Sequence, residues 1–165
     1  MRGVLALTVA ATLVACSTPY QPSGILGGFT ETQLDRNVFR VSFSGNGFTS
    51  GTRAEELALL HSAEVTLKNG FTHFAIVDGR SRTSYDAYAN PTQSRTLGTV
   101  TSTGSGATFA ADTRTTGGEV VVTAKPSTTN TIVCFNGRPN IAGVVFDAQF
   151  MFNSLSAKYG VSGNK

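Results

Sequence analysis

Residues 37–78, NVFRVSFSGNGFTSGTRAEELALLHSAEVTLKNGFTHFAIVD, predict a strand, a helix and a second strand in succession. The first strand is indicated by alternation, because Phe39, Val41 and Phe43 share one side of an extended chain and a more polar set occupies the other. Such a period of two is typical of a strand with one buried face. The sequence GNG at 45–47 predicts a turn before the helix.

The helix is expected from about Arg53 to Asn69. Thr52 and Glu55 have the spacing of a capping box, with Thr52 as the N-cap residue and Glu55 at N3. Gly70 is expected to end the helix. The apolar residues form a band too wide for burial on one side only: Leu59, Leu60, Ala63 and Leu67 on one edge, and Ala54, Leu57, Ala58 and Val65 on the other.

The second strand, residues 71–78, carries apolar groups on both faces, as a central strand of a sheet does. Residues 79–117 are rich in Ser, Thr, Gly and Arg, so irregular or edge strands around mobile turns are expected there. Two further strands are expected at 119–125 and 131–135. A turn at Pro126 is expected to separate them.

A last helix is expected to begin at Asp147, whose side chain suits an N-cap, and to end at Gly160. These elements predict an α+β fold with one domain over residues 29–160. In that domain an antiparallel or mixed sheet packs against the long helix and a C-terminal helix, and residues 161–165 form a tail. A chain of 165 residues is long enough for one domain with a sizeable core.

The N-terminus has the features of a secretory signal peptide. Arg2 supplies a positive charge, and the apolar run 3–15 is interrupted only by two threonines. A membrane-spanning helix needs about 20 apolar residues, so this run is too short to span and residues 1–15 are expected to be removed. Two prolines and three glycines follow in STPYQPSGILGG, so residues 16–28 are expected to form a flexible tether.

The segment Leu13-Val14-Ala15-Cys16 resembles the lipobox of bacterial lipoproteins. The resemblance implies that the Cys16 thiol receives a diacylglyceryl group, carrying fatty acyl chains such as palmitate, and becomes the N-terminus after cleavage. Two or three chains suffice for a stable anchor, whereas one chain binds a membrane only marginally. Ser17, in place of an aspartate after the cysteine, resembles the signal for sorting to the outer membrane.

The glycines Gly45, Gly47 and Gly51 lie between a strand and a helix, and Asp78 ends the next strand. This layout is similar to a dinucleotide-binding fingerprint. The first strand of such a site is buried on both faces, whereas this one alternates, so the glycines are expected to serve a turn. The net charge of +3 is scattered along the chain, which argues against a nucleic-acid partner.

His61 shares a helix face with Glu64, a pairing able to orient a proton transfer. With His73 and Asp78 it forms the candidate site of a hydrolase or of a small-ligand-binding protein. The other interpretation, which we favour, is a histidine at the margin of the core. No HxH, HExxH or CxxC spacing occurs, so we assign no metal ligand, no cofactor and no catalytic residue.

Cys134 shares strand parity with Ile132 and is expected to be a buried, unreactive thiol. The chain has two cysteines, so an acylated Cys16 leaves Cys134 without a disulfide partner. Glu55 and Glu56 are adjacent, and their side chains therefore diverge around the helix.

Several segments are similar to a family of small proteobacterial envelope lipoproteins whose function is uncharacterised: the lipobox at 13–16, TPYQP, NVFRVSFSGNGFTS, AEELALLHSAEVTLKNGF, FTHFAIVD and Phe146-Asp147-Ala148. The family has no assigned catalytic residues, so the resemblance implies none here. We expect a lipid-anchored protein of the bacterial outer membrane that faces the periplasm. Its role is expected to be non-enzymatic, an accessory or binding role with an envelope protein as partner. The alternative is a periplasmic hydrolase or ligand-binding protein with a site near His61 and His73.

Overall fold

The computed structural model describes residues 17–161, so the expected signal peptide, Cys16 and most of the expected tail lie outside the described residues. The fold is α+β, as predicted. Contacts divide the described chain into two compact units, one formed by 17–84 with 124–161 and the other by Tyr85–Thr123. The elements are β1 (Gly28–Asp35), β2 (Val38–Ser44), α1 (Gly51–Lys68), β3 (His73–Ala89), β4 (Gln93–Thr103), β5 (Gly106–Thr116), β6 (Val120–Phe135), β7 (Val145–Asp147) and α2 (Ala148–Tyr159).

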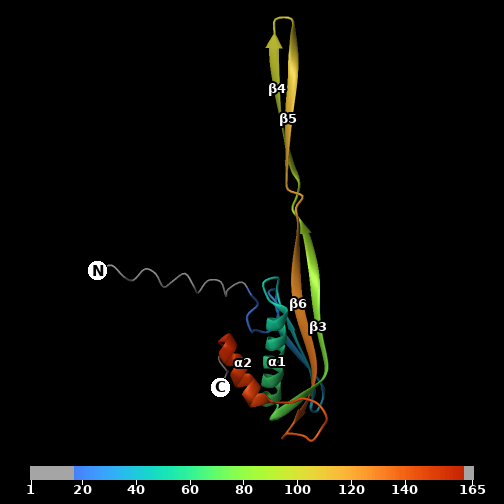
Figure 1. Cartoon of the computed structure of the whole chain (residues 1–165), viewed down its shortest axis with the longest axis vertical. Coiled ribbons are helices and arrows are strands. Elements are labelled where there is room, and N and C mark those ends of the chain that lie inside the picture. The colour runs from blue at the N-terminus through green and yellow to red at the C-terminus, as the bar shows by residue number, and fades with distance from the viewer. Residues whose placement is uncertain (1–16, 162–165) are drawn as a thin grey trace, which may run out of the picture. The chain divides into compact units, whose positions relative to one another are not determined.

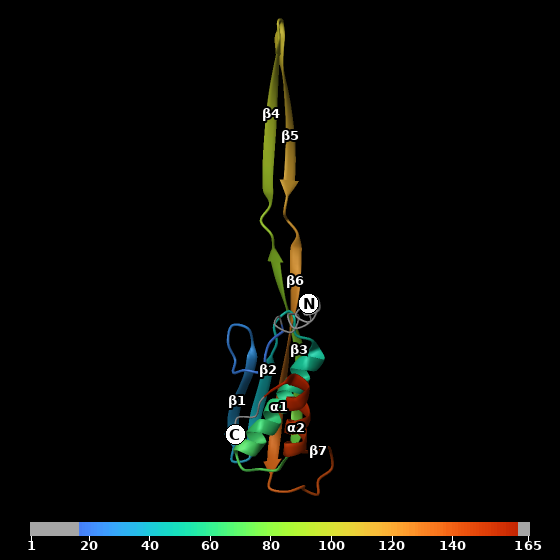
Figure 2. The ribbon, with the colours of Figure 1, turned by 90° about the vertical axis from the view of Figure 1, so that its left-hand side faces the viewer.

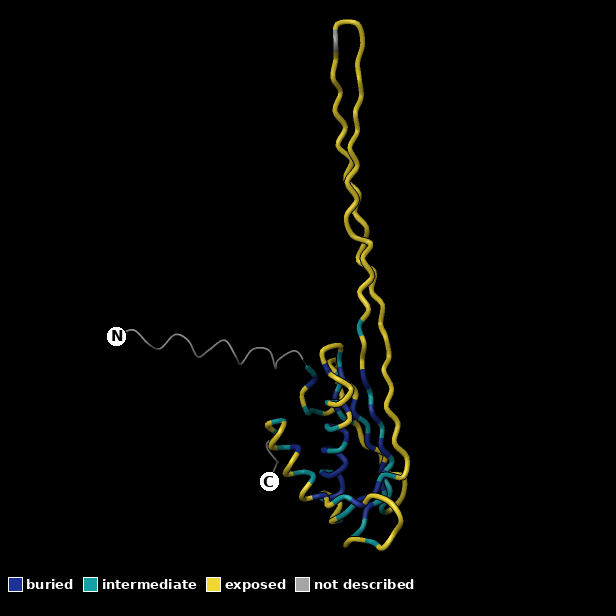
Figure 3. The backbone as a smooth tube through the Cα atoms, viewed as in Figure 1, coloured by how far each residue is buried: buried dark blue, intermediate teal, exposed yellow. Residues whose placement is uncertain are grey.

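The first unit contains a five-stranded sheet in the order β1-β2-β6-β3-β7. The pairs β1–β2, β2–β6 and β3–β7 are antiparallel. Both helices lie on one side of this sheet (Figures 1 and 2). Buried residues follow α1 and the strands beside it (Figure 3), so the core of this unit lies between the helices and one sheet face.

Strand β2 has the alternation that the sequence predicts. Phe39, Val41 and Phe43 are buried, whereas Arg40 is exposed. The buried side chains belong to two core clusters that also contain residues of α1. The apolar face of β2 is therefore the surface on which α1 packs.

The predicted two-sided burial of α1 is confirmed. One side of the helix contacts β1 and β2, and the other contacts α2. Met151 and Phe152 of α2 pack against both core clusters, which joins them over the helix. Nine residues of α1 are buried: Ala54, Leu57, Ala58, Leu60, His61, Ser62, Ala63, Val65 and Thr66.

The start of α1 differs from the capping box predicted at Thr52. The N-cap is Ser50, whose Oγ accepts a hydrogen bond from the backbone N of Arg53 at 3.1 Å. Glu55 instead accepts a hydrogen bond from the Ser81 hydroxyl at 2.9 Å. Both Ser50 and Thr52 fit an N-cap by residue type, and the fold selects Ser50 because the chain is still extended there.

The expected turn at Pro126 is wrong, because β6 runs without interruption through this residue. The Pro126 carbonyl accepts a hydrogen bond from the backbone N of Gly45 at 2.8 Å. In a strand, the backbone nitrogen and the carbonyl of one residue point toward the same neighbouring strand. The position of the N–H that Pro126 lacks therefore faces the end of β2, beyond the last register pair Ser44–Ser127. Proline is tolerated at such a margin because the ladder loses a single bond there.

The C-terminal helix is as predicted. The Asp147 carboxylate accepts a hydrogen bond from the backbone N of Phe150 at 2.8 Å, and Gly160 ends the helix with a φ of 64°. Gly160 has the left-handed conformation that favours glycine at this position.

Residues 17–28 pack on the domain and differ in this respect from the expected flexible tether. Thr18 is fully buried. Its backbone N donates to the Thr49 hydroxyl at 3.0 Å, and its own hydroxyl donates to the Leu26 carbonyl and accepts from the backbone N of Asn46, both at 2.8 Å. These hydrogen bonds, with Tyr20 packed against one core cluster, attach the segment to the domain. Few of its residues are apolar, which is why composition alone suggested a tether.

The second unit contains a hairpin of β4 and β5, so of the two alternatives expected for residues 79–117, irregular or edge strands, the structure has edge strands. The two strands pair in antiparallel register from Gln93–Thr116 to Thr103–Gly106. The described side chains from Tyr85 to Val122 are all exposed. This hairpin therefore has regular backbone pairing but no core of its own.

Replacing Ser50 by Ala should lower the free energy of unfolding of the full chain by about 1 kcal/mol, because the backbone N of Arg53 loses its acceptor. Thr52→Ala is the matched control, and it should change the free energy of unfolding by less than about 0.5 kcal/mol. Urea denaturation followed by circular dichroism measures both. A larger effect at Thr52 than at Ser50 would contradict the N-cap at Ser50 and support the capping box predicted at Thr52.

Candidate functional site

The densest group of ionisable side chains surrounds His61 on α1. Nδ1 of His61 lies 2.8 Å from the Tyr20 hydroxyl and 3.1 Å from Oε2 of Glu64. The Tyr20 hydroxyl donates to the same Glu64 oxygen, and Oε2 of Glu31 contacts Nε2 of His61. The ring of Phe29 stacks on the imidazole, with centroids 3.8 Å apart.

Three separate parts of the chain build this cluster. His61 and Glu64 are three residues apart on α1, as the sequence predicts. Phe29 and Glu31 share one face of β1, since side chains two residues apart point the same way. Tyr20 comes from the segment before β1. The sequence pattern revealed the pair on α1 but gave no signal for the other members, because β1 has mostly exposed residues.

Burial and the neighbouring charges together set the protonation of this cluster. Desolvation lowers the pKa of His61, and the opposing attraction of Glu31 and Glu64 does not cancel it. Burial also acts to raise the pKa of Glu64, but hydrogen bonds from Tyr20, Lys68 and His61 outweigh it and lower that pKa. Burial together with the neighbouring carboxylates raises the pKa of the Tyr20 hydroxyl. A neutral imidazole beside an ionised Glu64 and a protonated Tyr20 follows.

The cluster is closed to solvent at its centre. His61 exposes none of its surface, and Phe29 covers its ring. Nε2 touches Glu31 without the alignment of a hydrogen bond. A proton-transfer catalyst must reach a substrate, so this geometry fits a contact that fastens residues 17–28 and β1 to α1 better than it fits a catalytic site.

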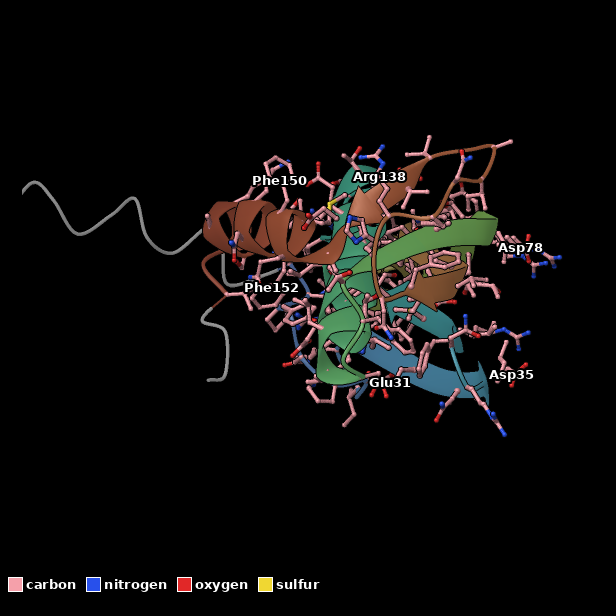
Figure 4. All side chains as sticks on the ribbon, turned by 90° about the horizontal axis from the view of Figure 1, so that it is seen from below. Glu31, Asp35, Asp78, Arg138, Phe150 and Phe152 are labelled. Carbon is pink, nitrogen blue, oxygen red and sulfur yellow. The ribbon has the colours of Figure 1, made fainter. Side chains whose placement is uncertain are left out.

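His73 and Asp78 lie apart from this cluster. Nδ1 of His73 is 2.9 Å from the Thr72 hydroxyl, and its Nε2 is 4.0 Å from Asp147. Asp78 contacts Arg80. Figure 4 shows Asp78 pointing away from the helices, whereas Glu31 lies beside α1. The fold therefore does not assemble His61, His73 and Asp78 into one site.

No group of three potential metal ligands gathers anywhere in residues 17–161. Cys134 is buried, as expected for a structural cysteine, with its sulfur 3.4 Å from the Thr66 hydroxyl. Burial raises the pKa of the Cys134 thiol, which keeps it protonated and unreactive.

The glycine-containing loop before α1 is held by hydrogen bonds between its own residues. Asn46 Oδ1 accepts hydrogen bonds from the backbone N of Phe48 and from the Thr49 hydroxyl, both at 3.0 Å. A Cβ at Gly45 would lie 2.6 Å from Cβ of Thr49, so glycine is needed there for a close approach. The loop serves a turn, as expected.

The hairpin β4–β5 is the second unusual feature. A two-stranded sheet has two open edges, and each exposes a row of unpaired backbone groups. Proteins protect such edges with charged residues or proline, yet residues 96–111 contain neither. The hydroxyls of Thr96 and Thr113 lie 2.9 Å apart across the strands, and those of Ser94 and Thr115 lie 3.1 Å apart. The edges of this hairpin are therefore suited to strand pairing.

Apolar side chains on the hairpin are also exposed. Val100 and Phe109 are directly opposite in the register, and they expose 65% and 70% of their surface. Phe109 covers Gly98, where a Cβ would lie 2.8 Å from the aromatic ring. An isolated two-stranded hairpin is only marginally stable in water, so cover by a second surface would stabilise this one.

In comparisons with known proteins, no family model matches this chain, and neither a curated protein nor a solved structure does. Within residues 17–161, neither α1 nor α2 is long and apolar enough to cross a bilayer.

The lowered pKa of His61 predicts how stability depends on pH. An unfolded chain binds a proton at His61 near pH 6.5 and the folded chain does so only at lower pH, so unfolding takes up protons. The stability from this residue is complete above pH 6.5 and falls as the pH decreases below it. The slope should approach at most about 1.4 kcal/mol per pH unit, measured by urea denaturation between pH 5 and pH 8.

His61→Gln should remove this slope. Glu64 adds a loss of stability in the same direction, but only at the lower pH where carboxylates titrate. Stability that increases as the pH falls from 7 to 5 would show that the carboxylates outweigh burial at His61.

Proposed function

We propose that this chain is a lipid-anchored protein of the bacterial outer membrane, facing the periplasm, with a non-enzymatic binding role. It belongs, in this proposal, with the small proteobacterial envelope lipoproteins that its sequence resembles. The contact with another envelope protein is made by the hairpin β4–β5 through strand pairing. The observation that carries the binding role is a regular hairpin with two open edges and no buried side chain among those that the structure describes.

Strand pairing fits the composition of the hairpin. A partner strand would satisfy the backbone groups of one edge and would cover part of Val100, Phe109 and Leu97. Backbone hydrogen bonds give affinity in this mode of recognition, and side chains on alternate positions give specificity. A surface of Ser, Thr, Gly and Ala suits close approach of another strand.

The anchor and the fold are compatible. The lipobox-like segment ends at Cys16, and Thr18 is already buried in the first unit. Two residues span at most about 7 Å, so an acyl group on Cys16 would hold this unit close to the lipid headgroups. The domain would then be attached at the membrane surface and not on a long linker.

The alternative function, a hydrolase or ligand-binding protein with a site near His61 and His73, is less well supported. His61 has no exposed surface, and His73 contacts a different set of residues. Packing and hydrogen bonding account for the contacts of the cluster around His61. Binding by the hairpin needs no such site.

Replacing Cys16 by Ser should release the protein from membranes into the soluble fraction, because no thiol remains to be acylated. Cys134→Ser is the matched control and should stay with the membranes, since that sulfur is buried. Fractionation of cells and intact-mass analysis of the wild type measure the anchor. Membrane attachment of the Cys16→Ser protein, or a wild-type mass without acyl groups, would remove the anchor from the proposal.

A photo-crosslinking residue at Leu97 should form an adduct with an envelope protein in living cells. The matched control is the same residue at Phe150, an exposed apolar position of α2, where no adduct is expected. Mass spectrometry identifies the adduct. Equal labelling of abundant neighbours from both positions would contradict a specific contact by the hairpin.

The substitutions Thr99→Pro and Val100→Pro test whether the contact between the hairpin and its partner is strand pairing. Consecutive residues of β4 direct their N–H groups alternately toward β5 and toward the open edge, so one proline disturbs the hairpin and the other only its edge. Strand pairing predicts that both variants lose the Leu97 adduct. Contact through side chains alone would survive the proline that affects only the edge.

A further inference from the structure

A pocket lined by three arginines lies on the sheet of the first unit. Its lining residues are Arg40 of β2, Arg80 and Arg82 of β3, and Ser127 and Thr129 of β6, around a volume of about 370 Å³. The strand order explains this grouping, because β6 lies between β2 and β3. Arginines from the two outer strands therefore flank the hydroxyls of the middle strand. We call this group the arginine pocket.

The arginine pocket lies on the sheet face opposite the helices. Arg40 alternates with Phe39 and Val41, which are buried toward α1. Thr129 likewise alternates with the buried Thr128 and Asn130 of β6. Side chains of successive strand residues point to opposite faces, so Arg40 and Thr129 point away from the core.

The positive charge of the arginine pocket is largely uncompensated. Arg80 contacts the Asp78 carboxylate at 3.3 Å. Arg40 and Arg82 have no carboxylate partner among residues 17–161. Charged residues make up only 14% of the sequence, so three arginines around one pocket are a marked concentration. The negative charge of Asp78 offsets one of the three arginines, so two positive charges remain to attract an anion.

We propose that the arginine pocket binds a phosphate group. Guanidinium groups form paired hydrogen bonds with phosphate oxygens, and hydroxyls donate to the remaining ones. Neighbouring strands are about 4.8 Å apart, so Arg40 and the β3 arginines start from backbones roughly 10 Å apart and can reach one tetrahedral anion over β6. A phosphate dianion also matches the two uncompensated charges, whereas a single carboxylate does not.

The phosphate can belong to a soluble molecule or to a lipid headgroup, and both sources present the same chemistry to the arginine pocket. The inference does not depend on the hairpin contact or on acylation of Cys16, because it rests only on residues of β2, β3 and β6. If the arginine pocket bound no phosphate, the proposed function would be unaffected. If the hairpin contact or the anchor failed its test, the inference about the arginine pocket would be unaffected.

The test uses the full chain with Cys16→Ser, so that acyl groups do not contribute to vesicle binding. Inorganic phosphate is titrated while the arginine Nε–H signals are followed by NMR. In parallel, the protein is sedimented with phosphatidylglycerol vesicles and with phosphatidylcholine vesicles. Both measurements are made at low ionic strength and repeated at about 0.5 M salt, where exposed charges are screened.

Arg40→Gln and Arg82→Gln should each weaken binding by about ten-fold, since each removes charged hydrogen bonds to the anion. Arg36→Gln, an exposed arginine outside the pocket, is the matched control and should bind as the parent does. Arg40→Lys keeps the charge but not the paired hydrogen bonds and should weaken binding by an intermediate amount. Thermal melting followed by circular dichroism checks that each variant is folded.

Saturable binding of inorganic phosphate that Arg40→Gln and Arg82→Gln weaken supports a soluble ligand. Sedimentation with phosphatidylglycerol vesicles that depends on the same two arginines supports a lipid headgroup. Two results would overturn the inference: binding of neither probe, or binding that folded Arg40→Gln and Arg82→Gln variants retain at the level of Arg36→Gln.

Discussion

The packing of α1 against the apolar face of β2 is the interaction on which the first unit depends. Phe39, Val41 and Phe43 give β2 one fully buried face. α1 covers that face and is itself covered by α2, whose Met151 and Phe152 contact both core clusters. α1 contains polar as well as apolar residues. It is stable in the centre of this unit because it is enclosed on two sides. The opposite sheet face is left free, and there the arginines of β2 and β3 are exposed.

The N-terminal segment extends this arrangement toward the expected anchor. Thr18 and Tyr20 are attached to the loop before α1 and to α1 itself by hydrogen bonds, and Phe29 stacks on His61. Each contact joins the start of the described chain to the core. A lipid on Cys16 would therefore hold a folded domain close to the membrane surface.

The sequence predicted the elements in which buried residues recur at a regular spacing. The alternation in β2, the wide apolar band of α1 and the Asp147 and Gly160 boundaries of α2 are all visible in residue type and spacing. The N-cap was predicted two residues too late because Ser50 and Thr52 are equivalent by type. Pro126 was read as a break, although its position at the end of β2 makes it harmless.

The candidate sites were harder to predict. His61 and Glu64 follow from helical spacing, but Tyr20 and Glu31 join them only through tertiary packing. Edge strands or irregular chain were expected at 79–117, but the regular pairing of β4 with β5 was not, because residues rich in Ser, Thr and Gly give only weak alternation of apolar and polar residues, which is the usual signal of a strand. The arginine pocket depends on β6 lying between β2 and β3, an order that no local pattern contains.

Hydrogen exchange of the backbone amides tests most directly whether the hairpin is a contact element. The account predicts that amides of α1 and β2 exchange slowly in the purified protein, whereas those of β4 and β5 exchange rapidly because no other element covers the hairpin. In membranes of the source cells, where the proposed partner would cover the hairpin, β4 and β5 should become protected. Hairpin amides as protected in the purified protein as those of α1, or equally unprotected in the membrane, would contradict the account.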